Sequence, residues 1–446
     1  PTRGGTRTAT QGAIEVTMRT HRQAHCTLCC HAWVLVGVFV CGFLGVVVAP
    51  VPVTAAAVCD VRQYGASGDG VTPDTRAIRA AVAACQDGGT VAFPPGRYLM
   101  GPLNLTSFQT LYLEKGAELL GSTDLQDWHV VAPLPSYGKG RESNWARYGP
   151  LLGAYNATNV AIAGEGTING QGHFWWEAHK KGELKYTRPR LVEFEFCTGV
   201  SITGVTMRNS PFWTVHPYAC TGVFISGVEI HNPTLSPNTD GIDPDSCQDV
   251  LITHCRIASG DDNISIKSGM DAAGRFFARP SQNITVSHVE FLGGTGAAIG
   301  SEMSGDVRDI TFQDCSFYLS ANVVRIKTGR GRGGVVENIW FQDLSVDGVA
   351  EAISINMFSH SNLPPQPPVA TPTVRNIRMV NIKGVAAEAG NLNCLPESPC
   401  TGIHMEHVEI VAPLGFRCSN ATGSSLNVLP KSCLLPEDAP AHVFSD

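Results

Sequence analysis

From residue 159 onward the chain returns again and again to one short pattern, a polar residue or glycine followed by alternating apolar positions. Alternation with a period of two predicts a short strand at each return. From residue 199 the starts lie 23, 27, 34, 26, 29, 38 and 26 residues apart. These intervals are too long for hairpins and too short for a helix-bearing unit at every step. The nine segments are 159–162, 199–202, 222–225, 249–252, 283–286, 309–312, 338–341, 376–379 and 402–405.

Repeats of this length that contain only strands and turns favour a parallel β-helix, in which each coil covers the apolar face of the one before. A propeller fits less well, because a blade needs about 40 residues. Residues 75–84 have helical composition and are predicted to cap the open end of the solenoid. We therefore predict an all-β fold, a single-stranded right-handed parallel β-helix with a short N-terminal capping helix. Residues 122–150 are expected to form a long loop beside a groove.

A second strand follows the first in many repeats, and its segments align without gaps: 263–267, 296–300, 323–327 and 351–355. Equivalent positions of adjacent coils stack about 4.8 Å apart. This register predicts that Asp240, Asp262, Arg325 and Lys327 lie on one face of consecutive coils.

The N-terminal region has the features of a targeting signal. Residues 32–49 form an uncharged apolar run, preceded by Arg19 and Arg22 and followed by Thr54-Ala55-Ala56-Ala57, an Ala-x-Ala cleavage site. We expect residues 1–57 to be an N-terminal extension and secretory signal peptide, with Met18 as a start of ordinary length, and residues 58–446 to be the catalytic domain. The alternative is a transmembrane anchor, since 18 apolar residues can just span a bilayer.

The net charge and the expected extracellular location limit the possible binding partners. Residues 58–446 hold 28 basic and 38 acidic residues, which makes nucleic acid an improbable partner. An acidic chain still binds an anionic substrate where Arg and Lys gather in one cleft. We expect a secreted monomer, in the extracellular space or cell wall, with no stable membrane association once the signal is cleaved.

Eleven cysteines lie in residues 58–446, and outside the cell most of them would pair. Local bridges Cys59–Cys85, Cys394–Cys400 and Cys418–Cys433 are plausible, and the odd count leaves at least one free thiol. There is no Cys-x-x-Cys pair and no tight histidine cluster in this region, so no metal site and no cofactor are expected. Glycosylation sequons begin at Asn104, Asn156, Asn263, Asn283 and Asn420; Asn263 adjoins the acidic turns and is expected to escape modification.

Two acidic turns about one repeat apart are the predicted site of chemistry. Asn238-Thr239-Asp240-Gly241 supplies one carboxylate, and Gly260-Asp261-Asp262 supplies two. Taken singly, an Asp in a turn usually satisfies the local backbone. Three on adjacent coils would repel one another without a cationic partner or a proton-transfer task. Arg325 and Lys327, two coils further on, would supply the cations.

These residue types fit the cleavage of an acidic polysaccharide. Glycosidic hydrolysis needs one protonated acid at the leaving oxygen and one ionised carboxylate to activate water. Crowding would raise the pKa of one carboxyl and keep it protonated in mildly acidic conditions. Arg325 and Lys327 would hold a uronate carboxylate. His216, one coil earlier, either lines the groove or is a hydrogen-bonded structural histidine.

At these residues the chain resembles glycoside hydrolase family 28, the polygalacturonases of the pectin-degrading β-helix group. Four segments carry the match in order: 238–241, Gly260-Asp261-Asp262, Gly-Ser-Glu-Met-Ser-Gly at 300–305 and Arg-Ile-Lys at 325–327. The resemblance covers residues 59–410 and implies an inverting hydrolase of α-1,4-linked galacturonan. It implies Asp261 as general acid, Asp240 and Asp262 as the pair that holds the attacking water, and Arg325 and Lys327 as ligands of the substrate carboxylate. Asn238 is expected beside them.

Two departures from the family pattern concern the substrate. Thr295 stands in Gly294-Thr295-Gly296, where the family usually has histidine, and the family's late tyrosine has no counterpart in residues 355–359. These changes leave a rhamnose-containing or branched pectin open as the substrate. The Gly-Ser-Glu-Met-Ser-Gly form and the loop 122–150 look more like exo-acting members.

Other functions compete with hydrolysis. A pectin lyase would share the fold and could use the three aspartates to bind calcium, although Arg-Ile-Lys in this register fits the hydrolases better. A catalytically silent β-helix that binds cell walls would fit Thr295 and the missing tyrosine.

Overall fold

The computed structural model describes residues 57–437, except residues 87, 143–144 and 360–362. All of them belong to one unit of the chain, residues 55–446. The predicted extension and signal peptide lie outside the described residues, apart from Ala57. No described helix has the length and apolar character needed to cross a membrane.

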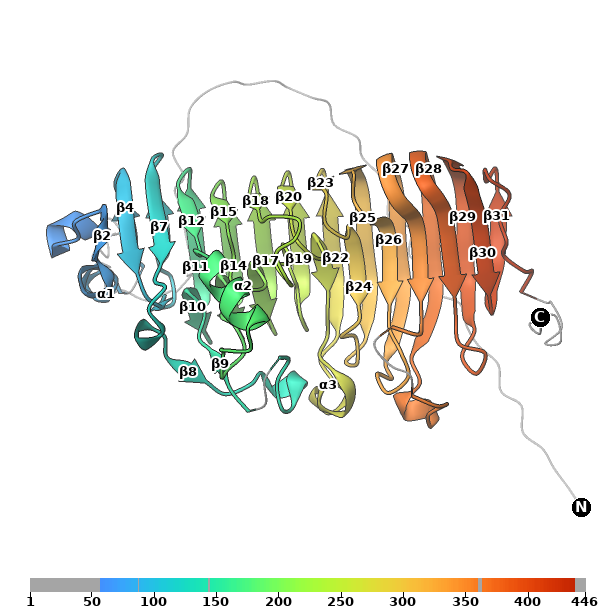
Figure 1. Ribbon diagram of the computed structural model, residues 1–446, viewed down its shortest axis with the longest axis horizontal. Helices are drawn as coiled ribbons and strands as arrows, with labels where there is room; N and C mark the ends of the chain where they lie inside the picture. The colour runs from blue at the N-terminus through green and yellow to red at the C-terminus, as the bar shows by residue number, and fades with distance from the viewer. Residues whose placement is uncertain (1–56, 87, 143–144, 360–362, 438–446) are drawn as a thin grey trace, which may run out of the picture. The chain divides into compact units, whose positions relative to one another are not determined.

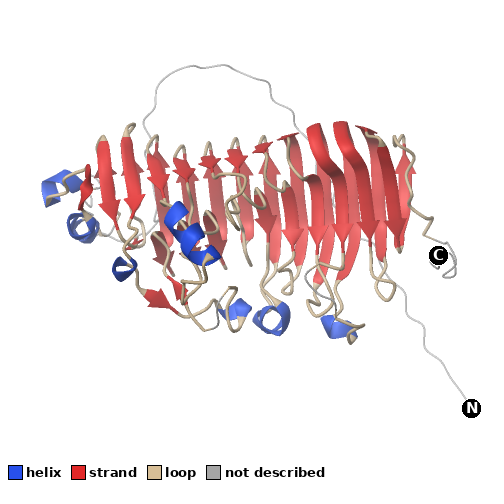
Figure 2. Cartoon of the chain, viewed as in Figure 1, coloured by secondary structure: helices blue, strands red, loops and turns tan. Residues whose placement is uncertain are grey.

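The described chain winds into a solenoid whose coils stack strand on strand (Figures 1 and 2). Strands of successive coils pair in parallel and form three columns. The predicted parallel β-helix is therefore present. The first column holds all nine predicted strands and consists of β1 (Val58–Asp60), β3 (Thr90–Phe93), β6 (Thr110–Leu113), β11 (Thr158–Gly164), β14 (Thr198–Thr203), β17 (Thr221–Ser226), β19 (Gln248–Thr253), β22 (Ser281–Ser287), β25 (Val307–Tyr318), β27 (Val335–Asn356), β28 (Thr373–Asn393), β29 (Cys400–Val411) and β31 (Ala421–Leu426).

The second column follows the first after a bend, and the long strands β25, β27, β28 and β29 continue into it. Its separate strands are β2 (Asp69–Pro73), β4 (Gly96–Met100), β7 (Ala117–Gly121), β12 (Thr167–Asn169), β15 (Thr206–Arg208), β18 (Glu229–His231), β20 (Arg256–Ala258) and β23 (Glu290–Leu292).

The third column carries the predicted functional residues. It consists of β5 (Leu103–Asn104), β10 (Leu152–Tyr155), β13 (Val192–Glu195), β16 (Val215–Tyr218), β21 (Ile264–Ile266), β24 (Ala297–Gly300), β26 (Asn322–Lys327), the ends of β27 and β28, and β30 (Leu414–Ser419). Single bridges from Ile242 to Val215 and to Ile264 connect β16 to β21. The column is thus continuous through the first acidic turn.

The polar residue or glycine that opens each repeat has a backbone reason. All nine opening residues have positive φ, from 53° at Asn159 to 71° at Gly199, a region that Gly, Asn and Asp tolerate best. Their side chains also link coils, since Asn338 donates to Asp309 at 3.0 Å and Asn283 donates to Asp249 at 2.6 Å. The residue that opens each repeat is therefore a backbone bend at the start of a first-column strand.

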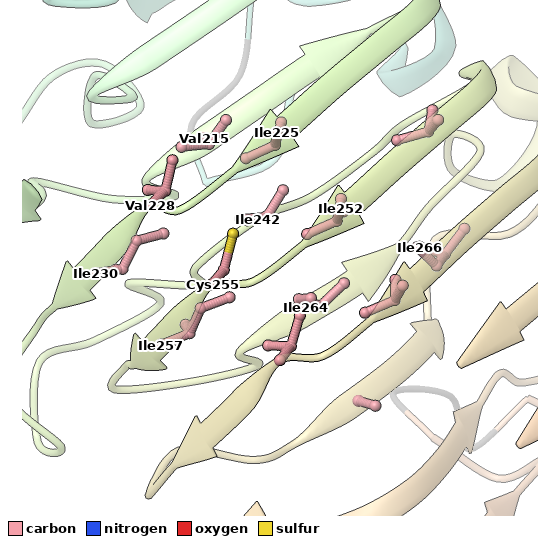
Figure 3. Close-up of a cluster of buried hydrophobic side chains, with 14 of the residues drawn as sticks. Val215, Ile225, Val228, Ile230, Ile242, Ile252, Cys255, Ile257, Ile264 and Ile266 are labelled. Carbon is pink, nitrogen blue, oxygen red and sulfur yellow. The ribbon is translucent and has the colours of Figure 1, made fainter. Parts of the chain in front are cut away.

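The core is a set of aliphatic stacks, one from each column. Figure 3 shows Ile225 over Ile252, Ile230 over Ile257, and Val215 over Ile242, and the pairings agree. All of these side chains are fully buried. Because each coil covers the next, burial of this kind continues along the solenoid.

The N-terminal end is capped as predicted. Helix α1 (Thr75–Ala84) spans the expected residues and buries Ile78, Ala81 and Val82 against the first coils. A 3-10 turn, η1 (Val61–Tyr64), precedes it. Helix α2 (His173–Lys180) was not predicted; it buries Trp175.

Residues 122–150 form the expected long loop. It contains η2 (Leu125–Asp127), η3 (Pro135–Tyr137) and two short strands, β8 (Val130–Val131) and β9 (Arg147–Tyr148), which pair antiparallel. Helix α3 (Asp271–Phe277) packs against η3, where Met270 N donates to Ser136 O at 2.9 Å. The Pro-rich loop near residue 365 ends in η4 (Pro368–Ala370).

All three predicted disulfides are present: Cys59–Cys85, Cys394–Cys400 and Cys418–Cys433. The five other cysteines of the described chain, at 197, 220, 247, 255 and 315, are buried free thiols. Asn263 is also buried, and its amide donates to Ile257 O at 2.8 Å.

The predicted register holds for three of the four third-column segments and is wrong for the last. Arg325 pairs with Ala298 as expected, but it pairs with Ser354 on the other side, one residue beyond the predicted Ile353. Glu351 likewise pairs with Asn322 rather than with Val323, so the whole segment is displaced by one residue from the predicted register.

Candidate active site

Coil stacking places Asp240 beside Asp262. Ile242 bridges Ile264, and Gly241 N donates to Asp262 O at 2.9 Å, so the residues two positions earlier are neighbours in the column. The next coil adds Thr295, whose Oγ1 donates to Asp262 Oδ1. Asp240 and Asp262 are both buried.

Two cations converge on Asp262 from two coils further on. Arg325 Nη1 lies 2.8 Å from Oδ1, and Lys327 Nζ lies 2.6 Å from Oδ2. They reach across the intervening coil because Ala298 and Gly300 occupy the paired positions there. These cations hold the pKa of Asp262 well below its ordinary range against the opposing effect of burial. Asp262 is therefore ionised throughout the working range of an enzyme.

Asp240 has a different environment. Burial, together with the charges of Asp261 and Asp262, raises its pKa from 3.8 to about 7 against the opposing effect of Lys267. Oδ2 of Asp240 accepts from Lys267 Nζ at 3.3 Å, while Oδ1 has no donor among the described residues. Asp240 is thus the carboxyl to which the expectation of a raised pKa applies, and it titrates near neutral pH.

Asp261 is the most accessible of the three carboxylates. Its residue is only partly buried, and Oδ2 accepts from the Asn238 amide at 3.1 Å. Asn238 is held in turn by buried Arg188, which donates to its Oδ1 at 3.2 Å and to Glu142 at 2.5 Å. Asn238 therefore orients the Asp261 carboxylate and is itself connected through Arg188 to Glu142 of the loop 122–150.

His216 lies in the same column but has no exposed surface. Its Nδ1 lies 2.8 Å from Glu193 and its Nε2 lies 3.4 Å from Asp245. Of the two positions left open by the sequence, the groove and the interior, His216 occupies the interior. In this structure it does not reach a ligand in the groove, so the expected substrate contact is corrected to a buried hydrogen-bonded position.

The loop 122–150 lies over the third column and contacts coils on both sides of the acidic cluster. Tyr137 donates to Asp245 at 2.5 Å, and Arg141 lies 2.9 Å from Glu302. Arg147 lies 2.6 Å from Glu195 and also pairs with Glu193. On the C-terminal side Arg325 keeps 27% of its side chain exposed.

Sequence reasoning missed a buried charged layer behind the site. Lys267 lies within 4 Å of Asp240, Asp243 and Glu302. The available signals were the position of Lys267, which shares a column with Lys327 across Gly300, and Glu302 inside the quoted Gly-Ser-Glu-Met-Ser-Gly segment. Within the described residues no group of three His, Cys, Asp or Glu side chains is arranged to hold a metal ion.

This arrangement can transfer protons and hold an anion. It offers a carboxylate kept ionised, a buried carboxyl that titrates near pH 7, an accessible carboxyl and two cations in one cluster. Those are the groups for acid and base assistance to the hydrolysis of a sugar linkage. The fold and the site together define a glycoside hydrolase built on a right-handed parallel β-helix.

The chain belongs to family 28 of the glycosyl hydrolases, whose family model matches residues 89–433. It is 37% identical to a probable polygalacturonase of Vitis vinifera over 398 residues, which cover 85% of this chain and 80% of that protein. It is 30% identical to an exopolygalacturonase of Zea mays, covering 84% of this chain and 88% of the relative.

Solved structures agree with this assignment. The crystal structure of a hyperthermoactive exopolygalacturonase from Thermotoga maritima superposes with a TM-score of 0.70 at 28% identity. The match covers 84% of this chain and 92% of that one.

Proposed function

We propose that this enzyme hydrolyses the α-1,4-galacturonosidic bonds of pectin with inversion of configuration. The observation that carries the proposal is the cluster of Asp240, Asp261 and Asp262 beside Arg325 and Lys327. The polygalacturonase names of its relatives support the same substrate. A uronate has a carboxylate that Arg325 and Lys327 can bind, whereas a neutral sugar has none.

The environments of the three carboxylates suggest their roles. Asp261, the accessible one, is the general acid at the leaving oxygen. Asp262, held ionised by its cations, and Asp240, with an unsatisfied Oδ1, hold and deprotonate the attacking water. Because Asp240 carries a raised pKa, the pH profile tests this assignment. A base role for Asp240 gives an acidic limb near pH 7, and an acid role gives an alkaline limb there.

We further propose that the enzyme acts on chain ends. The loop 122–150 lies over the third column on the N-terminal side of the site, where Arg147 pairs with Glu193 and Tyr137 donates to Asp245. A polymer entering from the C-terminal coils reaches the carboxylates with one end and cannot continue past them. The exopolygalacturonase names of two relatives support this mode.

Hydrolysis is favoured over calcium-dependent elimination by the partners of Asp262. Both of its oxygens are engaged by cationic side chains, and a divalent cation would have to displace them. A silent cell-wall-binding protein is disfavoured because Thr295 still donates a hydrogen bond to Asp262. The carboxylate support is therefore kept without the family's histidine.

The decisive experiment incubates the wild type, Asp261→Asn and Asp309→Asn with polygalacturonate and with rhamnogalacturonan. Asp309 is the matched control, since it is an exposed turn residue at a position that is Asn in neighbouring coils. We expect reducing ends from the wild type and the control only, monomeric product, and inverted anomers by NMR. Equal release by Asp261→Asn would sink the hydrolase proposal, and an unsaturated, ultraviolet-absorbing product would indicate the lyase. Mixed oligomers from the start of the reaction would exclude action on chain ends.

A further inference from the structure

A single lysine lies under the acidic cluster, out of contact with solvent. Lys267 follows β21 and keeps only 3% of its side chain exposed. Its Nζ lies 3.3 Å from Asp240 Oδ2, 3.6 Å from Asp243 Oδ1 and 3.7 Å from Glu302 Oε2. It also donates to Ser265 Oγ at 3.2 Å and lies 4.6 Å over the Trp213 ring. Polar and aromatic groups thus fix the ammonium group in one place.

Of these acidic neighbours, Asp240 is the one left to balance Lys267. Glu302 is already paired through Oε1 with Arg141 at 2.9 Å. Asp243 Oδ1 lies farther from Lys267 Nζ than Asp240 Oδ2 does, and neither oxygen of Asp243 has a hydrogen-bond partner among the described residues. A buried cation without a balancing anion is costly. Asp240 is therefore the nearest carboxylate to Lys267 and the one of the three that accepts a hydrogen bond from it.

We propose that Lys267 is a positioning residue of the reaction that acts through Asp240. It orients the Asp240 carboxylate through Oδ2, leaves Oδ1 facing no competing donor, and supplies the counter-charge that lets this buried carboxylate ionise. The inference rests on the proposed hydrolysis, because it assigns a task to Asp240. It adds a residue that does not touch the substrate.

All charged groups around the pair act in known directions. Asp240 also senses Asp261 and Asp262, which raise its pKa, and Lys327, which lowers it. Lys267 is held charged by Asp243, Asp240, Glu302 and Asp262, so its pKa lies well above the ordinary value. Arg141 interacts electrostatically with Asp240 as well as with Glu302, and Arg332 interacts with Glu302. Without Lys267, the carboxylates around Asp240 and its burial would all favour the protonated form.

The test compares the pH dependence of kcat and KM in three variants on polygalacturonate. In Lys267→Met the limb near pH 7 should move to higher pH by about one unit or more, and kcat should fall by about tenfold or more. The Michaelis constant should change little, because Lys267 cannot reach the polymer. Lys267→Arg keeps the charge and should keep the limb close to its wild-type position.

Glu302→Gln should move the limb of the pH profile in the opposite direction. It removes a competing anion from Lys267 and should move the same limb to lower pH, which general destabilisation of the fold would not do. This variant also keeps the inference testable if Lys267→Met fails to fold. Lys383→Met is the control, since Lys383 lies in an exposed pair with Glu409 at 3.1 Å.

The outcomes separate the two proposals. An inactive wild type would refute the proposed function. An active wild type whose limb stays in place in both Lys267→Met and Glu302→Gln would overturn the role of Lys267 alone. If Lys267→Met does not fold, an unmoved limb in Glu302→Gln overturns it. A rise in KM with an unchanged kcat would also overturn it, because that result describes a substrate ligand.

Discussion

Lys327 reaches back over one whole coil to place its Nζ 2.6 Å from Asp262 Oδ2. In the free enzyme the cation that we assign to the substrate is therefore already paired with a carboxylate. A bound uronate would share this lysine rather than meet it unpaired. Charge-assisted hydrogen bonds of this kind are stronger than neutral ones.

Replacing Lys327 with Met should weaken both the hold on the uronate and the support of Asp262. We expect kcat/KM on polygalacturonate to fall by about 10- to 100-fold, with much of the loss in KM. On fully methyl-esterified pectin, which lacks the anionic group, the loss should be smaller. Steady-state kinetics on both substrates check this, with Lys383→Met as the matched surface variant. An equal loss on both substrates would place Lys327 outside uronate recognition.

Thr295 is expected to act through its hydroxyl. Thr295→Val keeps the shape but removes the donor to Asp262, and we expect kcat to fall by about 2- to 10-fold. Thr295→Ser keeps the donor and should stay near the wild type. If the serine and valine variants are equally impaired, the methyl group rather than the hydroxyl matters.

The raised pKa of Asp240 has a consequence for stability. A carboxyl whose pKa is about 7 in the folded chain and about 4 in the unfolded chain favours folding most below pH 4. That contribution is lost as pH rises to 7. Asp240→Asn does not titrate, so its stability relative to the wild type should improve by roughly 2–3 kcal/mol between pH 5 and pH 8.

Urea denaturation at the two pH values measures this difference. Asp309→Asn, a change at an exposed turn, should show no such pH dependence. A constant difference between Asp240→Asn and the wild type at both pH values would mean that Asp240 does not titrate in this range.

The last coil should depend on its disulfide. Cys418–Cys433 closes a loop of 15 residues, for which the chain-entropy model gives about 3 kcal/mol. The Cys418→Ser, Cys433→Ser double variant should open the C-terminal coils to proteolysis at a lower temperature. Initial activity should be retained, because the carboxylates lie several coils away. Cys315→Ser, a change at a buried free thiol, is the comparison, and equal sensitivity in both variants would argue against a special role for the bridge.

Much of the fold was predictable because it is local and repetitive. The turn residue at positive φ and the alternation after it recur in every coil, so the nine strands and α1 could be placed from the sequence. The three disulfides join cysteines close in sequence. Helix α2 escaped prediction because it is only eight residues long and is stabilised by the burial of Trp175 against the core.

The site was predictable in part. The register of the repeats predicts that Asp240, Asp262, Arg325 and Lys327 share one face. The same register is wrong by one residue for the segment at Ile353. Lys267 was missed because a lysine at the end of an alternating strand looks the same whether exposed or buried. Lys267 is surrounded by Glu302 and Trp213, which are distant in sequence and which no local pattern reports. The interior position of His216 likewise depends on Glu193 and Asp245, which come from other coils.

The reach of Arg325 and Lys327 also bears on how the solenoid comes apart. In a simple stack each coil interacts only with its immediate neighbours, so a break can stop between any two of them. The contacts from β26 to Asp262 skip the coil of β24, and they add a second-neighbour interaction at this point of the array. The coils from residue 262 to residue 327 should therefore open and close as one cooperative block, which native-state hydrogen exchange would resolve as amides with a common opening free energy.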